Sequence, residues 1–184
     1  MQPSVRSIGI VAALVLAAAA ASIVKGANRF DGGTPVRVHA AAPEFTGIDH
    51  WFNSPPLTMG ELRGKVVLVD FWTYGCINCF HTLPYVNDWD RRYRGKGLTI
   101  VGIHTPEFPT ERITDSVKEA IQRYGIHFPV AQDNEYATWN AYGNRYWPAF
   151  YLIDKKGHIV YTHVGEGDYQ QTQAWIEKLL AEPD

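Results

Sequence analysis

The sequence predicts an α/β fold in which helices cover both faces of a mixed central sheet, forming a three-layer sandwich. The uninterrupted apolar run 65–72 has the composition of a strand buried on both faces. A helical pattern over 76–94 and a second apolar run over 98–103 follow it, and a strand–helix–strand unit implies parallel pairing. The runs 149–154 and 158–163 are joined by a Lys-Lys-Gly turn and predict a hairpin, which adds antiparallel strands.

The remaining elements form an inserted block and a closing helix. Residues 111–124 predict an amphipathic helix that Gly125 ends, residues 128–131 a short strand, and residues 136–142 a short helix. This αβα block lies between the second strand and the hairpin, and a helix over 170–180 follows the hairpin. The element order is therefore βαβ, an inserted αβα, a β-hairpin and a helix.

Three segments divide the chain. Residues 1–24 contain an uncharged run, 8–24, whose Ile, Val, Leu and Ala content is typical of a signal peptide or a short membrane anchor. Residues 25–43 combine Gly and Pro without periodicity and predict a linker. Residues 44–184 carry the pattern of the folded domain. We expect the chain to leave the cytoplasm, either secreted or tethered to a membrane through residues 8–24.

The bulk composition is that of a globular protein. The chain has 184 residues, of which 46% are hydrophobic and 20% charged, and its formal net charge is −2. Binding of nucleic acid through phosphate contacts needs an excess of positive charge. We therefore expect no nucleic acid among its partners.

The chemistry of the sequence is concentrated in Cys76 and Cys79, the two cysteines of the chain. They lie where the first long strand gives way to a helix. Because the free N–H groups and the dipole of a helix N-terminus stabilise a thiolate, we expect Cys76 to be the exposed attacking thiol. Cys79 follows one turn later on the same face, at a separation that a disulfide bridges, and we expect it to be the buried resolving thiol.

Other roles for the pair fit the pattern less well. An exported protein can contain a structural disulfide, but a bridge that encloses only two residues constrains the unfolded chain little and so stabilises the fold little. A zinc site needs about four ligands, and the sequence has one cysteine pair. Covalent haem attachment needs a histidine directly after the second cysteine, where Phe80 stands instead. We therefore expect a redox-active Cys76–Cys79 disulfide, with no metal and no other cofactor.

Residues near the pair in sequence or in the expected fold are further candidates. Asp70 lies inside the buried run, and we expect its carboxyl group to lie beneath the cysteines and to accept a proton from Cys79. A carboxylate that caps a local backbone group would fit the same position. Trp147 and Pro148 precede the hairpin and predict either a loop that contacts an extended substrate chain or a plain start of a strand. Tyr74 is a candidate apolar platform for substrate.

Two polar residues leave the second strand at its carboxyl end. His104 and Glu107 lie there, and in open α/β sheets this edge faces the site. Either of them is a candidate for tuning the pKa of a thiol, and either fits equally an ordinary loop residue.

The spacing of several motifs carries a family resemblance. The pattern Val-Asp-Phe-Trp-x-x-x-Cys-x-x-Cys over 69–79, with Pro84 in the helix and Pro148 later, resembles the thioredoxin superfamily. The inserted block, roughly 106–142, resembles the TlpA-like, membrane-tethered periplasmic branch of that superfamily.

Three short sequence motifs make the family resemblance more specific. Residues 72–79, 104–107 and 146–149 read Trp-Thr-Tyr-Gly-Cys-Ile-Asn-Cys, His-Thr-Pro-Glu and Tyr-Trp-Pro-Ala. They resemble the thioredoxin-like domain of DipZ-type cytochrome c biogenesis proteins, and the likeness covers about residues 44–181.

The resemblance implies both a fold and an activity. It implies a thioredoxin-like sandwich, a cis peptide at Trp147–Pro148, Cys76 as nucleophile and Asp70 as the buried acid. It implies a thiol-disulfide oxidoreductase that exchanges electrons with protein thiols and disulfides, as a reductase, for example in cytochrome c maturation. It places the domain on the periplasmic side of a bacterial inner membrane. Because this sequence carries no multi-span electron-transfer module, we expect a separate membrane electron donor of the CcdA/DsbD type.

The sequence departs from thioredoxin at three positions. Ile77 and Asn78 replace the Gly-Pro pair between the cysteines, and Gly75 replaces the preceding tryptophan. Gly102 stands where thioredoxin carries a lysine paired with its buried acid, so we expect Asp70 to titrate differently.

Two other classes of function share part of this sequence pattern. A peroxidase of the peroxiredoxin type shares the Thr73-x-x-Cys76 spacing, but Val69 stands where that motif needs a proline. A non-enzymatic assembly or binding module would use the pair as a passive bridge, or in metal delivery.

Overall fold

The computed structural model describes residues 39–183 of the protein. The expected signal or anchor segment, and the expected linker up to residue 38, lie outside the described residues. Within residues 39–183, no helix is long and apolar enough to cross a membrane.

A single six-stranded mixed sheet forms the middle layer, in the order β1-β4-β3-β2-β5-β6. β2, β3 and β4 pair in parallel, whereas β1, β5 and β6 run antiparallel to their neighbours. This arrangement confirms the predicted mixed sheet. The strands are β1 (His50–Phe52), β2 (Val66–Trp72), β3 (Leu98–His104), β4 (Val130–Gln132), β5 (Ala149–Ile153) and β6 (Ile159–Val164).

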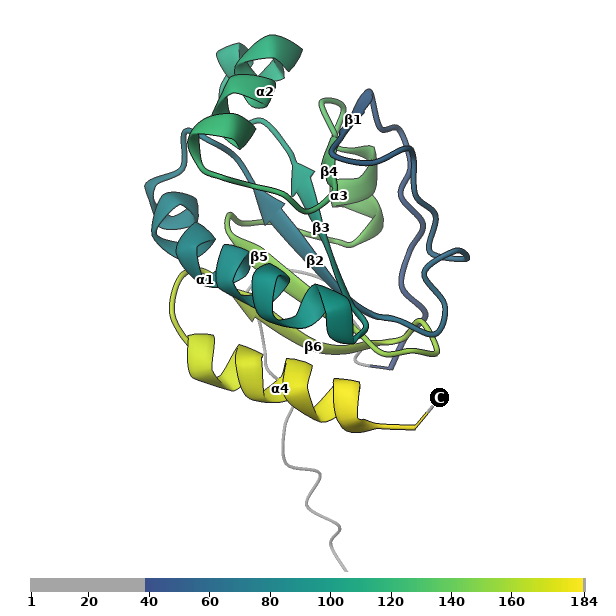
Figure 1. Ribbon diagram of the computed structural model, residues 1–184. Coiled ribbons are helices and arrows are strands. Elements are labelled where there is room, and N and C mark those ends of the chain that lie inside the picture. The colour runs from purple at the N-terminus through teal and green to yellow at the C-terminus, as the bar shows by residue number, and fades with distance from the viewer. Residues whose placement is uncertain (1–38, 184) are drawn as a thin grey trace, which may run out of the picture.

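Helices cover both faces of this sheet, so the predicted three-layer sandwich is confirmed (Figure 1). α1, α2 and α4 contribute to the core on one face, whereas α3 and the segment before β2 contribute to the core on the other. The helices are α1 (Ile77–Tyr93), α2 (Thr114–Arg123), α3 (Ala137–Ala141) and α4 (Tyr169–Ala181), with short 3-10 turns η1 (Arg94–Lys96) and η2 (Pro109–Arg112).

β2 is the strand that positions the site. All seven of its residues are buried, because β3 and β5 flank it and cores cover both of its faces. Its alternate residues point to opposite layers: Leu68 and Trp72 belong to the core beneath α1 and α4, and Val69 and Phe71 to the core beneath α3. Trp89 of α1 is fully buried over this sheet and meets Phe150 of β5 edge to face at 5.8 Å.

The predicted elements are confirmed, with shifted boundaries in the inserted block. η2 takes up the first residues of the predicted helix 111–124, and α2 begins at Thr114 because Ile113 is extended. The predicted strand 128–131 is realised as β4, two residues later. β1 was not predicted, because its three residues are too few to show an alternation of apolar and polar side chains.

The chain before residue 44 takes part in the fold. His39 and Ala42 donate backbone hydrogen bonds to Ile159 and Gly157, and Ala41 bridges His158. Residues 39–42, predicted to lie in the linker, therefore run beside the turn before β6 and the first residue of that strand.

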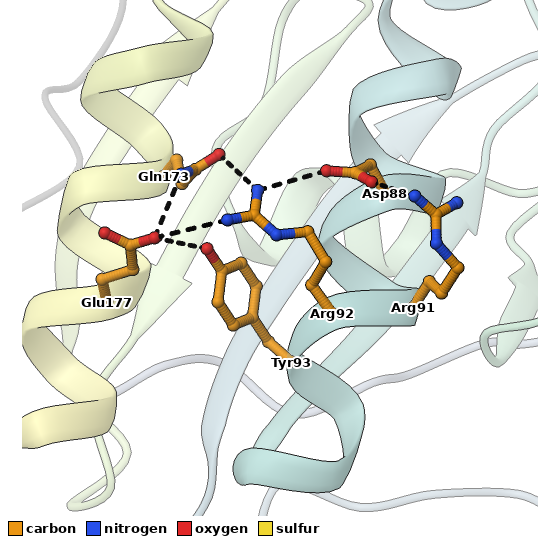
Figure 2. Close-up of polar contacts among 6 residues, drawn as sticks. All are labelled: Asp88, Arg91, Arg92, Tyr93, Gln173 and Glu177. Carbon is orange, nitrogen blue, oxygen red and sulfur yellow. Dashed lines mark hydrogen bonds and ion pairs between the residues drawn. The ribbon is translucent and has the colours of Figure 1, made fainter.

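Exposed polar groups join α4 to α1 (Figure 2). The Arg92 guanidinium contacts Asp88 on its own helix at 3.2 Å and reaches Gln173 at 3.0 Å and Glu177 at 3.8 Å on α4. The Tyr93 hydroxyl donates to the same Glu177 carboxylate. Since exposed ion pairs contribute little individually, the apolar core beneath them is the main attachment of α4.

Candidate active site

The site begins where β2 ends and α1 starts. Cys76 is the N-cap residue of α1, with extended backbone and no side-chain cap. Its N–H donates to the Thr73 carbonyl at 3.4 Å, and its own carbonyl accepts the Phe80 N–H at 3.1 Å. This turn leaves the first N–H groups of the helix directed toward the Cys76 sulfur, as expected from the sequence.

The two thiols have different surroundings, and neither is bridged in this structure. Cys76 is half-exposed, whereas Cys79 is 1% exposed in the core beneath α1. The hydrogen bond from the Cys79 thiol, aided by the N–H groups of Cys79 and Asn78, lowers the pKa of Cys76 to about 6. The pKa of Cys79 lies far above its ordinary value. Burial makes the largest contribution to this rise, and the hydrogen bond to Cys76 makes the next largest.

Asp70 lies in the same layer as this pair. It is 1% exposed, and its Oδ1 has no hydrogen-bond partner among residues 39–183. Burial raises its pKa from 3.8 to about 8, and its negative charge in turn helps to raise the pKa of Cys79. Asp70 is therefore close enough to Cys79 for its charge to act on that thiol; that Asp70 accepts the proton of Cys79 stays a prediction.

No cation faces Asp70 from the neighbouring strand. Asp70 pairs in register with Gly102 of β3, and the Trp72 indole lies over that glycine. The Trp72 Nε1 is 2.9 Å from where a Cβ at position 102 would lie. The indole therefore occupies the space that a longer side chain at 102 would need, and the carboxyl lacks a compensating charge there.

The Trp147–Pro148 loop lies beside the end of β2. The peptide between these two residues is cis, as the resemblance implied. Since Ala149 pairs with Phe71, the loop continues along the edge toward Thr73 and the cysteines. The Trp147 indole N–H donates to the Thr105 carbonyl at 3.0 Å, which fixes the ring at this edge of the sheet.

Tyr74 ties the site to the inserted block. Its ring stacks on His104, with centroids 5.5 Å apart, and its hydroxyl donates to the Thr110 carbonyl at 3.0 Å. Its carbonyl accepts the Tyr124 hydroxyl at 3.2 Å. Burial lowers the pKa of His104 to about 3, so this histidine is neutral and supplies no positive charge to the thiols.

Glu111, which the sequence pattern does not single out, is a buried carboxylate that lies against Gly75. Its Oε2 accepts the N–H groups of Glu107 and Phe108 at 2.6 and 3.1 Å, while its Oε1 is buried without a partner among residues 39–183. A Cβ at Gly75 would lie 2.1 Å from this Oε1. The glycine before Cys76 was the one sequence signal of a close approach.

Exposed apolar side chains lie near the dithiol. Ile77 and Phe80 come from the first turn of α1, and Phe108, from the loop after β3, approaches Gly75, with its Cδ2 4.0 Å from where a Cβ there would lie. Tyr146, in the loop before β5, is exposed as well. Phe108 is 55% exposed to solvent, whereas a large aromatic residue is more often buried. Among residues 39–183, no group of His, Cys, Asp and Glu side chains has a metal-binding arrangement.

The sheet topology and the dithiol at the start of its first long helix place the chain in the thioredoxin-like class of proteins. The chain belongs to the Redoxin family, whose model matches residues 37–180. It is similar to the protein DipZ of Mycobacterium tuberculosis, at 44% identity over 156 residues, which cover 83% of this chain and 22% of DipZ. The chain therefore spans less than a quarter of that relative.

Shorter relatives match over most of their length. The thiol-disulfide oxidoreductase ResA of Bacillus thuringiensis is 30% identical over 145 residues, which cover 78% of this chain and 79% of ResA. Among solved structures, the thioredoxin-like superfamily protein SPOA0173 is 31% identical with a TM-score of 0.72, covering 78% of this chain and 97% of its own. These matches confirm the thioredoxin-like fold and the DipZ-type and TlpA-type resemblance.

Proposed function

We propose that this protein is a reductase of protein disulfides that works on the periplasmic side of a bacterial inner membrane, for example in cytochrome c maturation. The contrast between the two thiols carries the proposal. Cys76 is accessible and its pKa is about 6, whereas Cys79 is buried and its pKa is raised. In a pair of this kind, the accessible thiol attacks the partner disulfide, and the buried thiol later resolves the mixed disulfide.

The first step is attack by the Cys76 thiolate on one sulfur of a partner disulfide. The partner's S–S bond breaks, and a mixed disulfide forms between Cys76 and the attacked sulfur. The other partner sulfur leaves as a thiolate and takes a proton from solvent.

The second step resolves the mixed disulfide. The Asp70 carboxylate accepts the proton of the Cys79 thiol, and the resulting thiolate attacks the Sγ of Cys76. The Cys76–Cys79 disulfide forms, the second partner sulfur leaves and is protonated, and two electrons have passed to the partner. A carboxyl whose pKa is about 8 is suited to this exchange, because its proton affinity lies near neutral pH.

The substrate lies against the Trp147–Pro148 loop and the apolar side chains around Cys76. Tyr74 supports this substrate seat indirectly. Its carbonyl and hydroxyl groups bond to the inserted block and its ring stacks on His104, so the ring is not free to pack on the substrate. Exposed apolar groups beside an attacking thiol suit a polypeptide partner, because they release water when the partner covers them.

The surroundings of the domain complete the proposal. Residues 8–24 act as a cleaved signal or a tether, and a separate membrane protein of the CcdA/DsbD type returns the Cys76–Cys79 disulfide to the dithiol. The redox-active pair is then the only cofactor that the reaction needs.

Two experiments test the direction and the roles. Redox titration against dithiothreitol or glutathione should give a potential near that of thioredoxin, roughly −270 mV or lower, whereas roughly −120 mV would indicate an oxidant and refute the reductase. A Cys79→Ser variant should accumulate mixed disulfides through Cys76, with Cys76→Ser as the control. If only the Cys76→Ser variant traps partners, the roles of the two thiols are reversed.

A further inference from the structure

We propose that the hollow beside the Trp147–Pro148 loop binds an acidic side chain of the substrate polypeptide, with Arg145 as the residue that selects it. The inference rests on the proposed function, since it assigns a substrate class to the same site. It adds a specificity-determining residue outside the dithiol chemistry.

The hollow lies between the end of α3 and the start of β5. Its volume is about 550 Å³, within the range of pockets that hold small molecules or side chains. Trp147 lines the hollow, which therefore adjoins the proposed substrate seat. The lining residues are Trp139, Asn140, Gly143, Asn144, Arg145 and Trp147.

The walls of the hollow are held in place from behind. The Trp139 and Trp147 rings lie 4.3 Å apart, and the Trp147 N–H is bonded to Thr105. The buried Asn144 side chain accepts the Tyr151 hydroxyl at 3.1 Å and donates to the Tyr146 carbonyl at 3.1 Å. A hollow whose walls are already ordered loses little conformational entropy when a ligand enters.

The charge of the hollow is positive and uncompensated. Arg145 is exposed and makes no hydrogen bond or ion pair with any other residue of the part of the chain that the structure describes, 39–183. By contrast, Arg92 is paired with Asp88 and Arg112 with Glu135. No acidic side chain lines the hollow. The planar guanidinium of arginine matches a carboxylate with two parallel hydrogen bonds, so a carboxylate is the group that this lining fits.

The position of the hollow sets the register of the substrate. Arg145 lies three residues before Pro148, so their Cα atoms are at most about 11 Å apart, a distance that an extended substrate chain covers in roughly three residues. We therefore place the acidic residue within roughly four positions of the cysteine of a polypeptide whose cysteine meets Cys76 and whose backbone follows the Trp147–Pro148 loop. An Asp or Glu there would meet the Arg145 side chain, with its aliphatic part against the tryptophan rings.

The test compares two synthetic disulfide peptides that differ only at these positions, one carrying Glu and the other Gln. Their reduction by the full-length dithiol protein is followed by stopped-flow tryptophan fluorescence at low salt. We expect the Glu peptide to be reduced with a kcat/KM about fivefold higher, as a partly exposed ion pair of about 1 kcal/mol provides. The preference should shrink as salt is raised.

Variants separate the charge of Arg145 from its shape. Arg145→Gln should abolish the preference, Arg145→Glu should reverse it, and Arg145→Lys should retain part of it. Arg63→Gln is the matched control, because Arg63 is another exposed arginine and precedes β2 at the end of the strand opposite to Cys76. Hydroxyethyl disulfide, which is uncharged and too small to reach the hollow, should be reduced at the same rate by all of these proteins.

The outcomes distinguish this inference from the function on which it rests. Equal rates for the two peptides with the wild-type protein, or a preference that survives Arg145→Gln, would overturn the acidic subsite while leaving the reductase intact. Failure of the wild-type dithiol to reduce either peptide or hydroxyethyl disulfide would overturn the proposed function itself.

Discussion

Replacing Cys79 by alanine tests whether the buried thiol holds the Cys76 thiolate. The hydrogen bond from Cys79 is the largest of the effects that lower the Cys76 pKa to about 6. A hydrogen bond to a charged group contributes roughly 1.5–3 kcal/mol, and one pKa unit corresponds to about 1.36 kcal/mol. Because Cys76 is half-exposed and solvent replaces part of the lost bond, we take the lower end of this range. We expect Cys79→Ala to raise the Cys76 pKa by about one unit.

The assay is the rate of alkylation by iodoacetamide between pH 4 and 10, with the modified residue identified by mass spectrometry. At pH 6 about half of the wild-type Cys76 and about a tenth of the variant's should be thiolate, so alkylation of the variant should be about fivefold slower there. Cys79→Ser keeps a hydroxyl donor and should show a smaller rise. If Cys79→Ala titrates like the wild type, the helix N–H groups alone stabilise the thiolate and our reasoning is wrong.

Three further predictions concern stability and the surroundings of the thiols. Burial raises the Asp70 pKa from 3.8 to about 8, so the folded protein holds a proton that the unfolded chain releases, and stability should fall as pH rises between these values. Asp70→Asn should remove this dependence in urea unfolding of the reduced protein. Gly75→Ala should destabilise by about 1–3 kcal/mol in the same assay, because its Cβ meets the Glu111 carboxylate. Trp89→Ala should cost about 3–5 kcal/mol, measured in the same way, because it empties a fully buried site.

Controls make each of these predictions specific. A pH profile of wild-type unfolding that is flat between pH 4 and 8 would contradict the assignment of Asp70. Combining Gly75→Ala with Glu111→Asp, which shortens the carboxylate side chain by one methylene, should recover part of the stability; no recovery would mean that the clash lies elsewhere. Trp89→Phe retains most of the ring volume and should lose less stability than Trp89→Ala, so equal losses would argue against a cavity effect.

Two elements of the fold have no clear signal in the local sequence: the first turn of the inserted block and the strand β1. The apolar period predicts a helix over 111–124, but residues 111 and 112 belong to the 3-10 turn η2, and the extended backbone of Ile113 separates this turn from α2. The three-residue strand β1 exists because β4 offers it an edge. Neither feature has a sequence period long enough to be visible, since both depend on what packs beside them.

The sequence by itself determined the mixed α/β order, the dithiol at a strand-to-helix junction and the buried acid before it. These features are local: a continuous apolar run specifies a buried strand, and a cysteine at a helix N-terminus meets free N–H groups whatever surrounds it. Asp70 could be predicted in the same way, because an acid inside such a run has to be buried.

The tertiary structure alone decided what meets these residues. It placed the Trp72 indole over Gly102, the Glu111 carboxylate against Gly75, and Arg145 in a hollow beside the substrate loop. Each contact depends on the register of strands and on the path of a loop, which arise from the packing of the whole chain. Burial and the absence of a counter-charge, rather than residue type, then set the pKa of Asp70, because desolvation depends on the atoms around a group and not on its neighbours in sequence.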